Sequence, residues 1–241
     1  MHINADFTRA AIVTADQYAW VPSPQSGVER VMLDRVGAEK ARATSIVRYA
    51  AGSHFREHGH PGGEEILVLS GTFSENFRDG QEQRTAHYPT GWYLRSPRGS
   101  AHQPFSTHGC TLFVKLWQFP PDDDVRVRTD SNDPARWTVR EGRHVCPLFA
   151  SERETVVLQR LEPGEALFPP PSRGSAEVLV LAGGLHAPEL TTAPCVPGSW
   201  LRLPALQPRP PLRAGIDGAT IYLKTGHLED RVDAVLADDC L

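Results

Sequence analysis

Apolar residues occur along the chain in short runs that alternate with polar residues, a pattern typical of β-strands rather than helices. The runs at 43–52, 64–73, 91–97 and 110–119 are rich in β-branched and aromatic residues and are bounded by Gly- and Pro-containing turns. Only residues 230–239 have a spacing that predicts a short helix. The pattern therefore predicts an all-β protein.

Three segments of the first half recur, in the same order, in the second half. Residues 48–73 align without a gap on 160–185, residues 89–97 match 196–204, and residues 109–119 match 218–228. Three matches in one order are hard to obtain by chance, so the chain is interpreted as a tandem duplication.

The segment between the two copies is rich in Pro, Asp, Ser and Asn, which favours a solvated connection. We therefore expect a first domain at 1–120, a linker at 121–136 and a second domain at 137–241.

Composition narrows the classes of protein. The chain has 241 residues, 40% of them hydrophobic, and a formal net charge of −4 without a basic cluster. This balance argues against nucleic acid or an anionic membrane as partner. No apolar run approaches the ~20 residues of a transmembrane helix, and the first ten residues lack the layout of a secretory signal.

The cysteines agree with a cytoplasmic protein. They lie far apart, without a C-x-x-C pair, which argues against a zinc ribbon or a redox dithiol and is typical of a reducing compartment. We interpret each of them as an ordinary thiol; they are Cys110, Cys146, Cys195 and Cys240.

Residues 56–73 contain the first chemical motif. His58 and His60 share one face of an extended strand because side chains at i and i+2 point the same way. The glycines at 62 and 63 allow a tight turn that swings Glu64 back towards them. Two imidazoles and one carboxylate at a single point suit a divalent transition metal.

A second motif follows in residues 91–102, where Gly91, Pro97, Gly99 and His102 are regularly spaced. Together the two motifs resemble both signature motifs of the cupin superfamily, except for the terminal Asn of the second. The resemblance implies an all-β fold with two tandem cupin double-stranded β-helix (jelly-roll) barrels, a bicupin.

The resemblance also implies the ligands of one metal ion per chain, namely His58, His60, Glu64 and His102. Zn and Fe are the first expectations for this ligand set, with Mn and Ni as alternatives, because these residue types alone do not select the metal. Up to two coordination positions would be left open for water, substrate or dioxygen.

Residues 20–119 resemble more closely the ChrR-type cupin, the C-terminal domain of zinc-dependent anti-sigma factors that sense oxidative stress. Those regulators bind sigma factors through an N-terminal helical domain that holds zinc with His and Cys. The first 45 residues here contain no Cys and only His2, so sigma-factor binding is not expected. The same subgroup is similar to non-haem iron dioxygenases that cleave β-diketones with three histidines and no glutamate.

The second copy has lost the ligands. In the alignment the four positions fall on Pro170, Ser172, Ala176 and a place near Arg209. The glycines and apolar strand positions remain, so the second domain is predicted to be a degenerate barrel without metal. Arg209 is interpreted as a solvated surface residue, with anion binding as the alternative.

Several other residues carry smaller predictions. Glu65 recurs as Glu177, which favours a structural pairing with a strand-borne arginine. Gln103 is expected to orient bound water. His54, His87 and His108 are interpreted as surface residues. Five aromatic residues near the motifs are each interpreted as ordinary core, with the lining of an apolar pocket over the metal as the alternative; they are Phe73, Trp92, Phe105, Phe113 and Trp117.

Two functions follow from these patterns. The first is a metal-dependent, oxygenase-type enzyme acting on a small oxygen-bearing organic molecule, with Glu64 as a ligand that shifts or takes a proton. The second is a non-catalytic, zinc-holding sensor related to ChrR. Either function implies a small-molecule partner and neither implies nucleic acid or membrane; homodimerisation is left open.

Overall fold

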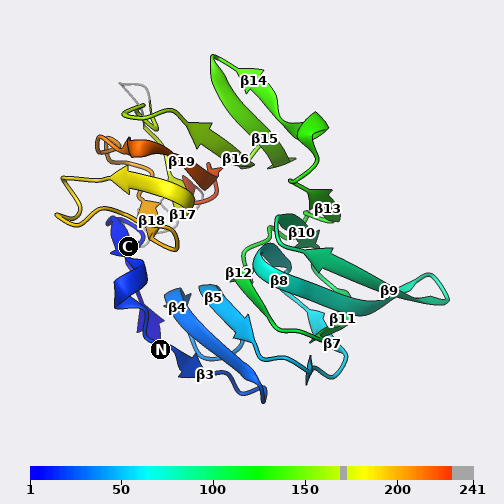
Figure 1. The fold of residues 1–241 in the computed structure, drawn as a ribbon. Helices are drawn as coiled ribbons and strands as arrows, with labels where there is room; N and C mark the ends of the chain where they lie inside the picture. Colours follow the sequence, from blue (N-terminus) through cyan, green and yellow to red (C-terminus); the bar gives the residue numbers. More distant parts are fainter. Residues whose placement is uncertain (169–172, 230–241) are drawn as a thin grey trace. The chain divides into compact units, whose positions relative to one another are not determined.

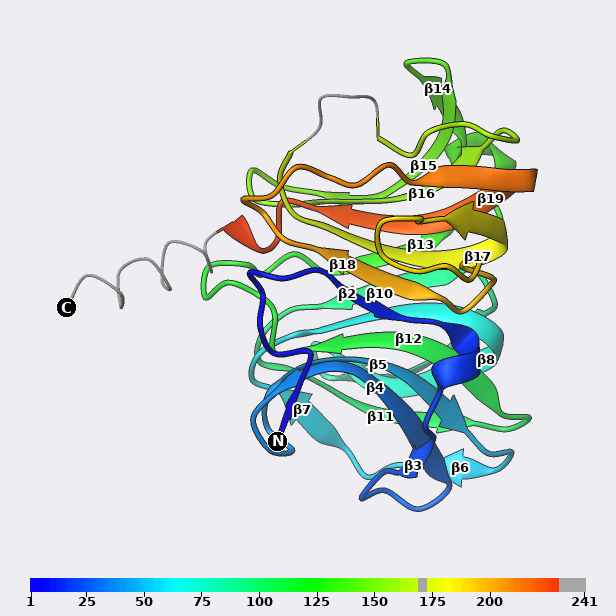
Figure 2. The ribbon, with the colours of Figure 1, turned by 90° about the vertical axis from the view of Figure 1, so that its left-hand side faces the viewer.

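The computed structural model describes residues 1–168 and 173–229 and is all-β, as predicted. It divides into two compact units (Figures 1 and 2). Unit 1 contains residues 1–5 and 19–132, and unit 2 contains residues 6–18 and the described residues from 133 onward. The helix predicted at 230–239, Cys240, Pro170 and Ser172 lie outside the described residues.

Unit 1 is built around one antiparallel sheet path. In spatial order its strands are β1 (His2–Ile3), β4 (Val28–Val36), β5 (Arg42–Tyr49), β12 (Cys110–Leu116), β8 (Glu64–Asp79), β10 (Trp92–Ser96) and β13 (Val127–Asp130). The remaining strands of unit 1 are β3 (Val21–Pro22), β6 (Ser53–His54), β7 (His58–His60), β9 (Glu82–Pro89) and β11 (Ser100–Ser106). A second group of paired strands lies off this path: β11 pairs with β6, β7 and β8, and β9 pairs with β8.

The long strand β8 takes part in both groups because it changes partners at Gly71. Before that residue β8 pairs with β10 and β12, and after it with β9 and β11. Gly71 has φ +72°, and a Cβ there would lie 2.2 Å from the carbonyl oxygen of Gly109. Only glycine allows the two backbones to approach so closely.

Unit 2 is a seven-stranded antiparallel sheet with the order β14 (Thr138–Arg140), β15 (Arg143–Ala150), β16 (Thr155–Leu161), β19 (Arg213–Thr225), β17 (Ala176–His186), β18 (Trp200–Leu203) and β2 (Ala11–Val13). Figure 2 shows β2, in blue, beside β18. Short 3₁₀ helices occupy Ala15–Gln17 and Pro134–Arg136.

The N-terminal segment and the linker differ from the sequence-based boundaries. Residues 6–18 belong to unit 2, because β2 pairs with β18 and the Tyr18 hydroxyl donates to the carbonyl of Gly198 at 2.5 Å. Within the predicted linker 121–136, β13 pairs with β10 and the Asp123 carboxylate accepts two hydrogen bonds from Arg95. Part of this polar segment, Val127–Asp130, is therefore an edge strand of unit 1.

A ladder of buried charges occurs once in each unit. On three neighbouring strands an arginine, a glutamate and a lysine lie in register, all at most 1% exposed; they are Arg95, Glu65 and Lys115 in unit 1, and Arg202, Glu177 and Lys224 in unit 2. The glutamates thus lie opposite strand-borne arginines, as predicted. The repetition in a unit without the metal-ligand motif indicates an architectural role.

Each unit has its own apolar core. In unit 1 the core includes Ile66, Phe73 and Leu112, and in unit 2 it includes Val178, Leu201 and other buried residues. Three of the cysteines, Cys110, Cys146 and Cys195, are buried free thiols. Among the described residues, no helix is long and apolar enough to cross a membrane.

Candidate metal centre

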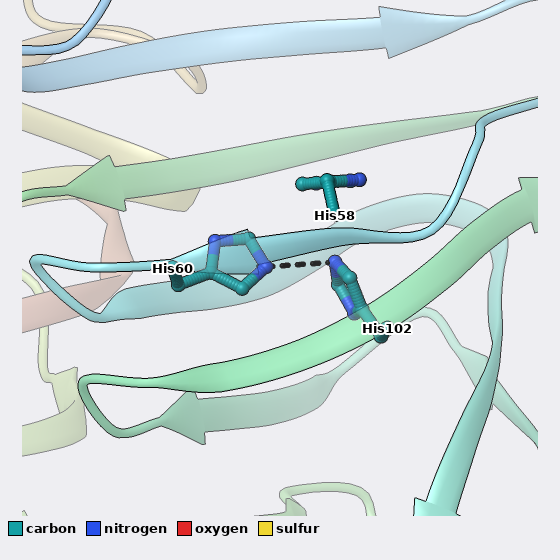
Figure 3. A group of neighbouring side chains, drawn as sticks. All are labelled: His58, His60 and His102. Atoms are coloured by element: carbon teal, nitrogen blue, oxygen red, sulfur yellow. Dashed lines mark hydrogen bonds between the residues drawn. The ribbon is translucent and has the colours of Figure 1, made fainter.

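Three predicted ligands, His58, His60 and His102, converge in unit 1. Each offers a ring nitrogen, and the three nitrogens lie within 4.8 Å of one another. His58 and His60 come from β7 and His102 from β11 (Figure 3). The ring centroids of His60 and His102 are 4.6 Å apart, and each is 5.0 Å from that of His58.

Strand pairing explains this convergence. In the antiparallel pair of β7 and β11, His102 lies directly opposite His58, and Ser100 lies opposite His60. The i, i+2 alternation points both β7 imidazoles to the face that carries His102. His60 and His102 are buried, while His58 lies at the exposed edge of the cluster.

The turn after β7 brings Glu64 to the same place. Gly63 has φ +75°, and a Cβ there would come within 2.4 Å of the Phe119 ring, so the turn requires glycine. The Oε2 atom of Glu64 lies 3.5 Å from Nε2 of His60 and 3.7 Å from Nε2 of His102. The carboxylate thus faces the two buried imidazoles.

Hydrogen bonds at Nδ1 orient two of the rings. The Nδ1 atom of His102 lies 2.6 Å from Oε2 of Glu75, and Nδ1 of His58 lies 3.0 Å from the carbonyl oxygen of Arg56. Both partners are acceptors, so each Nδ1 carries the proton and each Nε2 presents its lone pair to the cluster. This tautomer is the one a metal needs.

The spacing of the donor atoms fits one ion. Two ligands about 2.1 Å from a metal, at angles between a right angle and the tetrahedral angle, lie about 3.0–3.4 Å apart. The Nε2 atoms of His60 and His102 are 2.9 Å apart, and Glu64 Oε2 is slightly farther away. Two imidazole lone pairs facing each other this closely would repel unless a proton or a cation lies between them.

Glu75 was not identified from the sequence, although it is central to the site. Its Oε1 accepts hydrogen bonds from the Tyr88 hydroxyl and from Nη2 of Arg128, both at 2.9 Å. Burial alone would raise the pKa of Glu75, but the hydrogen bond from His102 and the charge of Arg128 outweigh it and lower the pKa to about 2.

The duplication contains a signal for Glu75. Extending the first aligned segment by two residues places Glu75 opposite Ala187, which is buried in unit 2. The carboxylate is therefore lost in the same copy that lost the ligands.

The surroundings of His60 favour its neutral form. Burial lowers the pKa of His60, and the nearby histidines lower it further, although Glu64 opposes them. Neutral imidazole is the form that binds a metal. Close by, burial and then the charge of Glu64 raise the pKa of Tyr49 well above its usual value, so this phenol remains a hydrogen-bond donor at neutral pH.

A cavity of about 230 Å³ adjoins the cluster and is bordered by His58, His60 and Glu64. Of the five aromatic residues considered for a pocket, only Trp117 borders this cavity, which Tyr49 and Phe55 also line. Phe73 and Phe113 are buried in the packing of the sheet, in agreement with their interpretation as core residues.

Other side predictions have mixed outcomes. The prediction for Gln103 was wrong: it is exposed on the opposite parity from His102 and accepts a hydrogen bond from Asn76 at 3.3 Å. His54, His87 and His108 are exposed, as predicted.

In the described part of unit 2 nothing replaces the cluster. Ala176, at the position of Glu64, is fully buried in β17. The guanidinium of Arg209 donates to the carbonyl oxygens of Gly174 and Ser175, so this residue is neither simply solvated nor open to an anion. Among the described residues, histidine, cysteine and carboxylate ligands gather for a metal only around His58, His60 and His102.

Comparison with solved structures identifies the class of fold. A putative dioxygenase from Nostoc punctiforme has a TM-score of 0.69 at 13% identity, covering 90% of this chain and 82% of its own. A Cupin 2 conserved barrel domain protein from Leptotrichia buccalis has 0.56 at 14% identity over 86% and 92%. The nickel(II) complex of the pirin YhhW from Escherichia coli has 0.62 at 13% identity over 90% and 98%.

These likenesses, together with the all-β architecture, show that the protein has a cupin fold. More specifically, residues 8–120 match the model of the ChrR Cupin-like domain family. None of the curated proteins matches the chain significantly.

Proposed function

We propose that the protein is a metal-dependent cupin of the oxygenase type that acts on a small oxygen-bearing organic molecule. His58, His60, Glu64 and His102 would hold one divalent ion, with Zn or Fe as the first candidates. The observation that carries the proposal is the convergence of the imidazoles, two of which have their Nδ1 atoms held by acceptors.

Each residue has a role that follows from its surroundings. Glu75 fixes the His102 ring and increases its basicity as a ligand. Glu64 would complete the ligand set, and its carboxylate, which faces His60 and His102, would be placed to take a proton from the substrate. When bound, a redox-active metal would supply oxygen and enolate activation. The cavity beside the cluster would shield the substrate from water.

The decisive experiment is metal analysis of protein purified without added metal, paired with an oxygen-consumption screen on small oxo and hydroxy compounds. We expect close to one equivalent of metal in the natural protein and near-complete loss in His60→Ala. The matched control is His108→Ala, because His108 is an exposed histidine outside the cluster. A full equivalent of tightly bound metal in His60→Ala would contradict the proposed ligand set.

The ChrR-type domain match favours a second candidate, a zinc-holding sensor without turnover. Zinc has no redox chemistry, so the metal identity separates the two functions. Iron with oxygen consumption supports the enzyme. Zinc as the native metal, without oxygen consumption across the screen, supports the sensor.

A further inference from the structure

The cavity beside the histidines also contains a buried positive charge that the proposed metal chemistry does not use. Arg30 and Arg35, both on β4, border the cavity together with His58, His60 and Glu64. Arg35 is only 2% exposed. A buried guanidinium is costly unless it is paired with an anion, so its partners need to be identified.

One carboxylate, that of Glu39, pairs with Arg30. Glu39, in the turn between β4 and β5, accepts both of its hydrogen bonds from Arg30, at 2.9 and 2.7 Å. Arg35 donates through Nη1 to the carbonyl of Ala38 instead. Two positive charges and one negative charge leave a net positive charge at this end of the cavity.

The guanidinium of Arg35 has unused hydrogen-bonding capacity. Its Nε atom is buried and, among the described residues, has no acceptor; the same holds for Nε of Arg30. Burial lowers the pKa of Arg35 and the charge of Arg30 lowers it further, with Glu39 opposing. An anion beside Arg35 would oppose the first two effects.

A β-bulge turns both arginines to the cavity. They are five residues apart, an odd spacing that would place them on opposite faces of a regular strand. The register of β4 against β5 shifts between Met32 and Asp34, so that Arg30 lies opposite Val47 and Arg35 opposite Ala43. Val47 and Ala43 share one parity of β5 and both border the cavity. Bulges are known to re-aim side chains next to functional sites.

Arg35 also lies in line with the metal ligands. In the strand register Arg35, Ala43, Leu116 and Glu64 are successive neighbours across β4, β5, β12 and β8. Three strand spacings amount to at most about 14 Å between the first and last Cα atoms, and an extended arginine side chain covers about half of that. The guanidinium and the imidazoles therefore flank one short space.

Aliphatic side chains make up much of the wall of this cavity, together with the polar groups of Ser45 and Tyr49. The aliphatic residues are Val28, Val47, Ile66, Leu112, Val114 and Leu116. The volume of about 230 Å³ is below the roughly 300–1,000 Å³ of pockets for drug-sized ligands. The space thus suits a small, short aliphatic ligand with one polar group at each end.

We propose that this cavity binds a small aliphatic carboxylate, whose carboxylate group pairs with Arg35 and whose other end presents an oxygen atom to the histidine cluster. The orientation of the second oxygen rests on the proposed metal site, whereas the anion pairing rests on Arg35 alone. Arg35 is a binding residue in this assignment, and Glu39 keeps Arg30 from competing for the ligand.

The test compares oxo acids with neutral diketones. Pyruvate, acetoacetate and levulinate are titrated calorimetrically into zinc-loaded protein, alongside diacetyl, acetylacetone and acetonylacetone, in which a methyl group replaces a carboxylate oxygen. We expect at least one acid to bind about 10-fold or more tightly than its diketone, the effect of a charged hydrogen bond. Absence of binding by every acid at millimolar concentration, or equal binding of acid and diketone, overturns the proposal.

Substitutions then test whether Arg35 is the residue that binds the carboxylate. Arg35→Met should abolish the preference for the acid, and Arg35→Lys should retain part of it. The matched control is Arg48→Gln, because Arg48 pairs with Glu29 at 2.7 Å on the exposed face of the same two strands. Retention of the preference in Arg35→Met, or its loss in Arg48→Gln, overturns the assignment.

Two further measurements distinguish loss of the anion site from loss of folding stability and from loss of the metal. The melting temperature of Arg35→Met should stay within about 4 °C of the natural protein, the shift of a minor change in a domain of this size; a larger fall would assign Arg35 a structural role instead. Metal content is measured in the same samples. If the natural protein takes up no zinc but still binds acids in an Arg35-dependent way, the metal proposal fails while the anion site stands.

Discussion

The Nδ1 atom of His102 lies 2.6 Å from the Oε2 atom of Glu75, a carboxylate that is 1% exposed and shared with Arg128 and Tyr88. This contact links the candidate metal centre to a residue outside both sequence motifs. Carboxylate–histidine–metal arrangements fix the ring and its tautomer, so the Glu75–His102 pair should set how well the cluster holds its ion.

The first prediction concerns Glu75→Gln. The amide preserves the shape and can still accept the His102 proton, but it removes the negative charge that makes the imidazole a better ligand. We expect zinc affinity to fall about 10–100-fold in a protein that stays folded, as measured by competition with a chromophoric chelator.

The matched control for that prediction is Glu82→Gln. Glu82 is an exposed glutamate of β9, and its carboxylate pairs with Arg84 rather than with the cluster. Its removal should leave zinc affinity unchanged. Equal affinities for Glu75→Gln and the natural protein would show that Glu75 does not tune the site.

The second prediction concerns pH and Arg128. Because the pKa of Glu75 falls from its ordinary 4.5 to about 2 on folding, its ionised form stabilises the native state above pH 4.5. That contribution is lost progressively as the pH falls from about 4.5 towards 2. In Arg128→Met the carboxylate loses its cation and its native pKa rises, so it contributes less stability above pH 4.5 and less is lost on acidification.

Urea denaturation as a function of pH in metal-free protein measures this effect. Between pH 4.5 and 2 the natural protein should lose more stability than Arg128→Met, whereas Arg136→Met, a change in an exposed residue of a short 3₁₀ helix, should lose as much as the natural protein. Equal losses for Arg128→Met and the natural protein would refute the coupling.

Much of the histidine cluster could be predicted because neighbouring residues in the sequence determine where its side chains point. His58 and His60 share a face by simple alternation, and the glycines after them return Glu64 to that face. Glu75 and Arg128 were not predictable in the same way. Glu75 reaches His102 only because β8 changes partners, and Arg128 lies in a polar segment that pairs with β10 across the fold.

The same distinction applies to the rest of the fold. Alternation predicted the strands at 43–52 and 110–119 close to where β5 and β12 lie. Residues 11–13 pair with β18, nearly two hundred residues away, and nothing local in the sequence reports that contact. Likewise, the bulge between Met32 and Asp34 moves the Arg35 side chain to the other face of the sheet. A prediction based on the regular alternation of side chains along a strand does not include such a shift.

The last prediction separates the roles of the two units. Leu201 is fully buried in the core of unit 2, at some distance in sequence from every candidate ligand. Leu201→Ala should cost about 2–5 kcal/mol in the free energy of unfolding, from lost burial and the cavity left behind. Its metal stoichiometry, measured on the folded fraction, should match that of the natural protein.

His60→Ala should show the reverse, losing the metal while metal-free stability changes little, because metal stabilises only in proportion to its occupancy. Leu206→Ala is the control, since Leu206 is 65% exposed and its truncation should alter neither quantity. Urea unfolding combined with metal analysis decides the matter: a loss of metal from folded Leu201→Ala protein would mean that unit 2 contributes to the site directly.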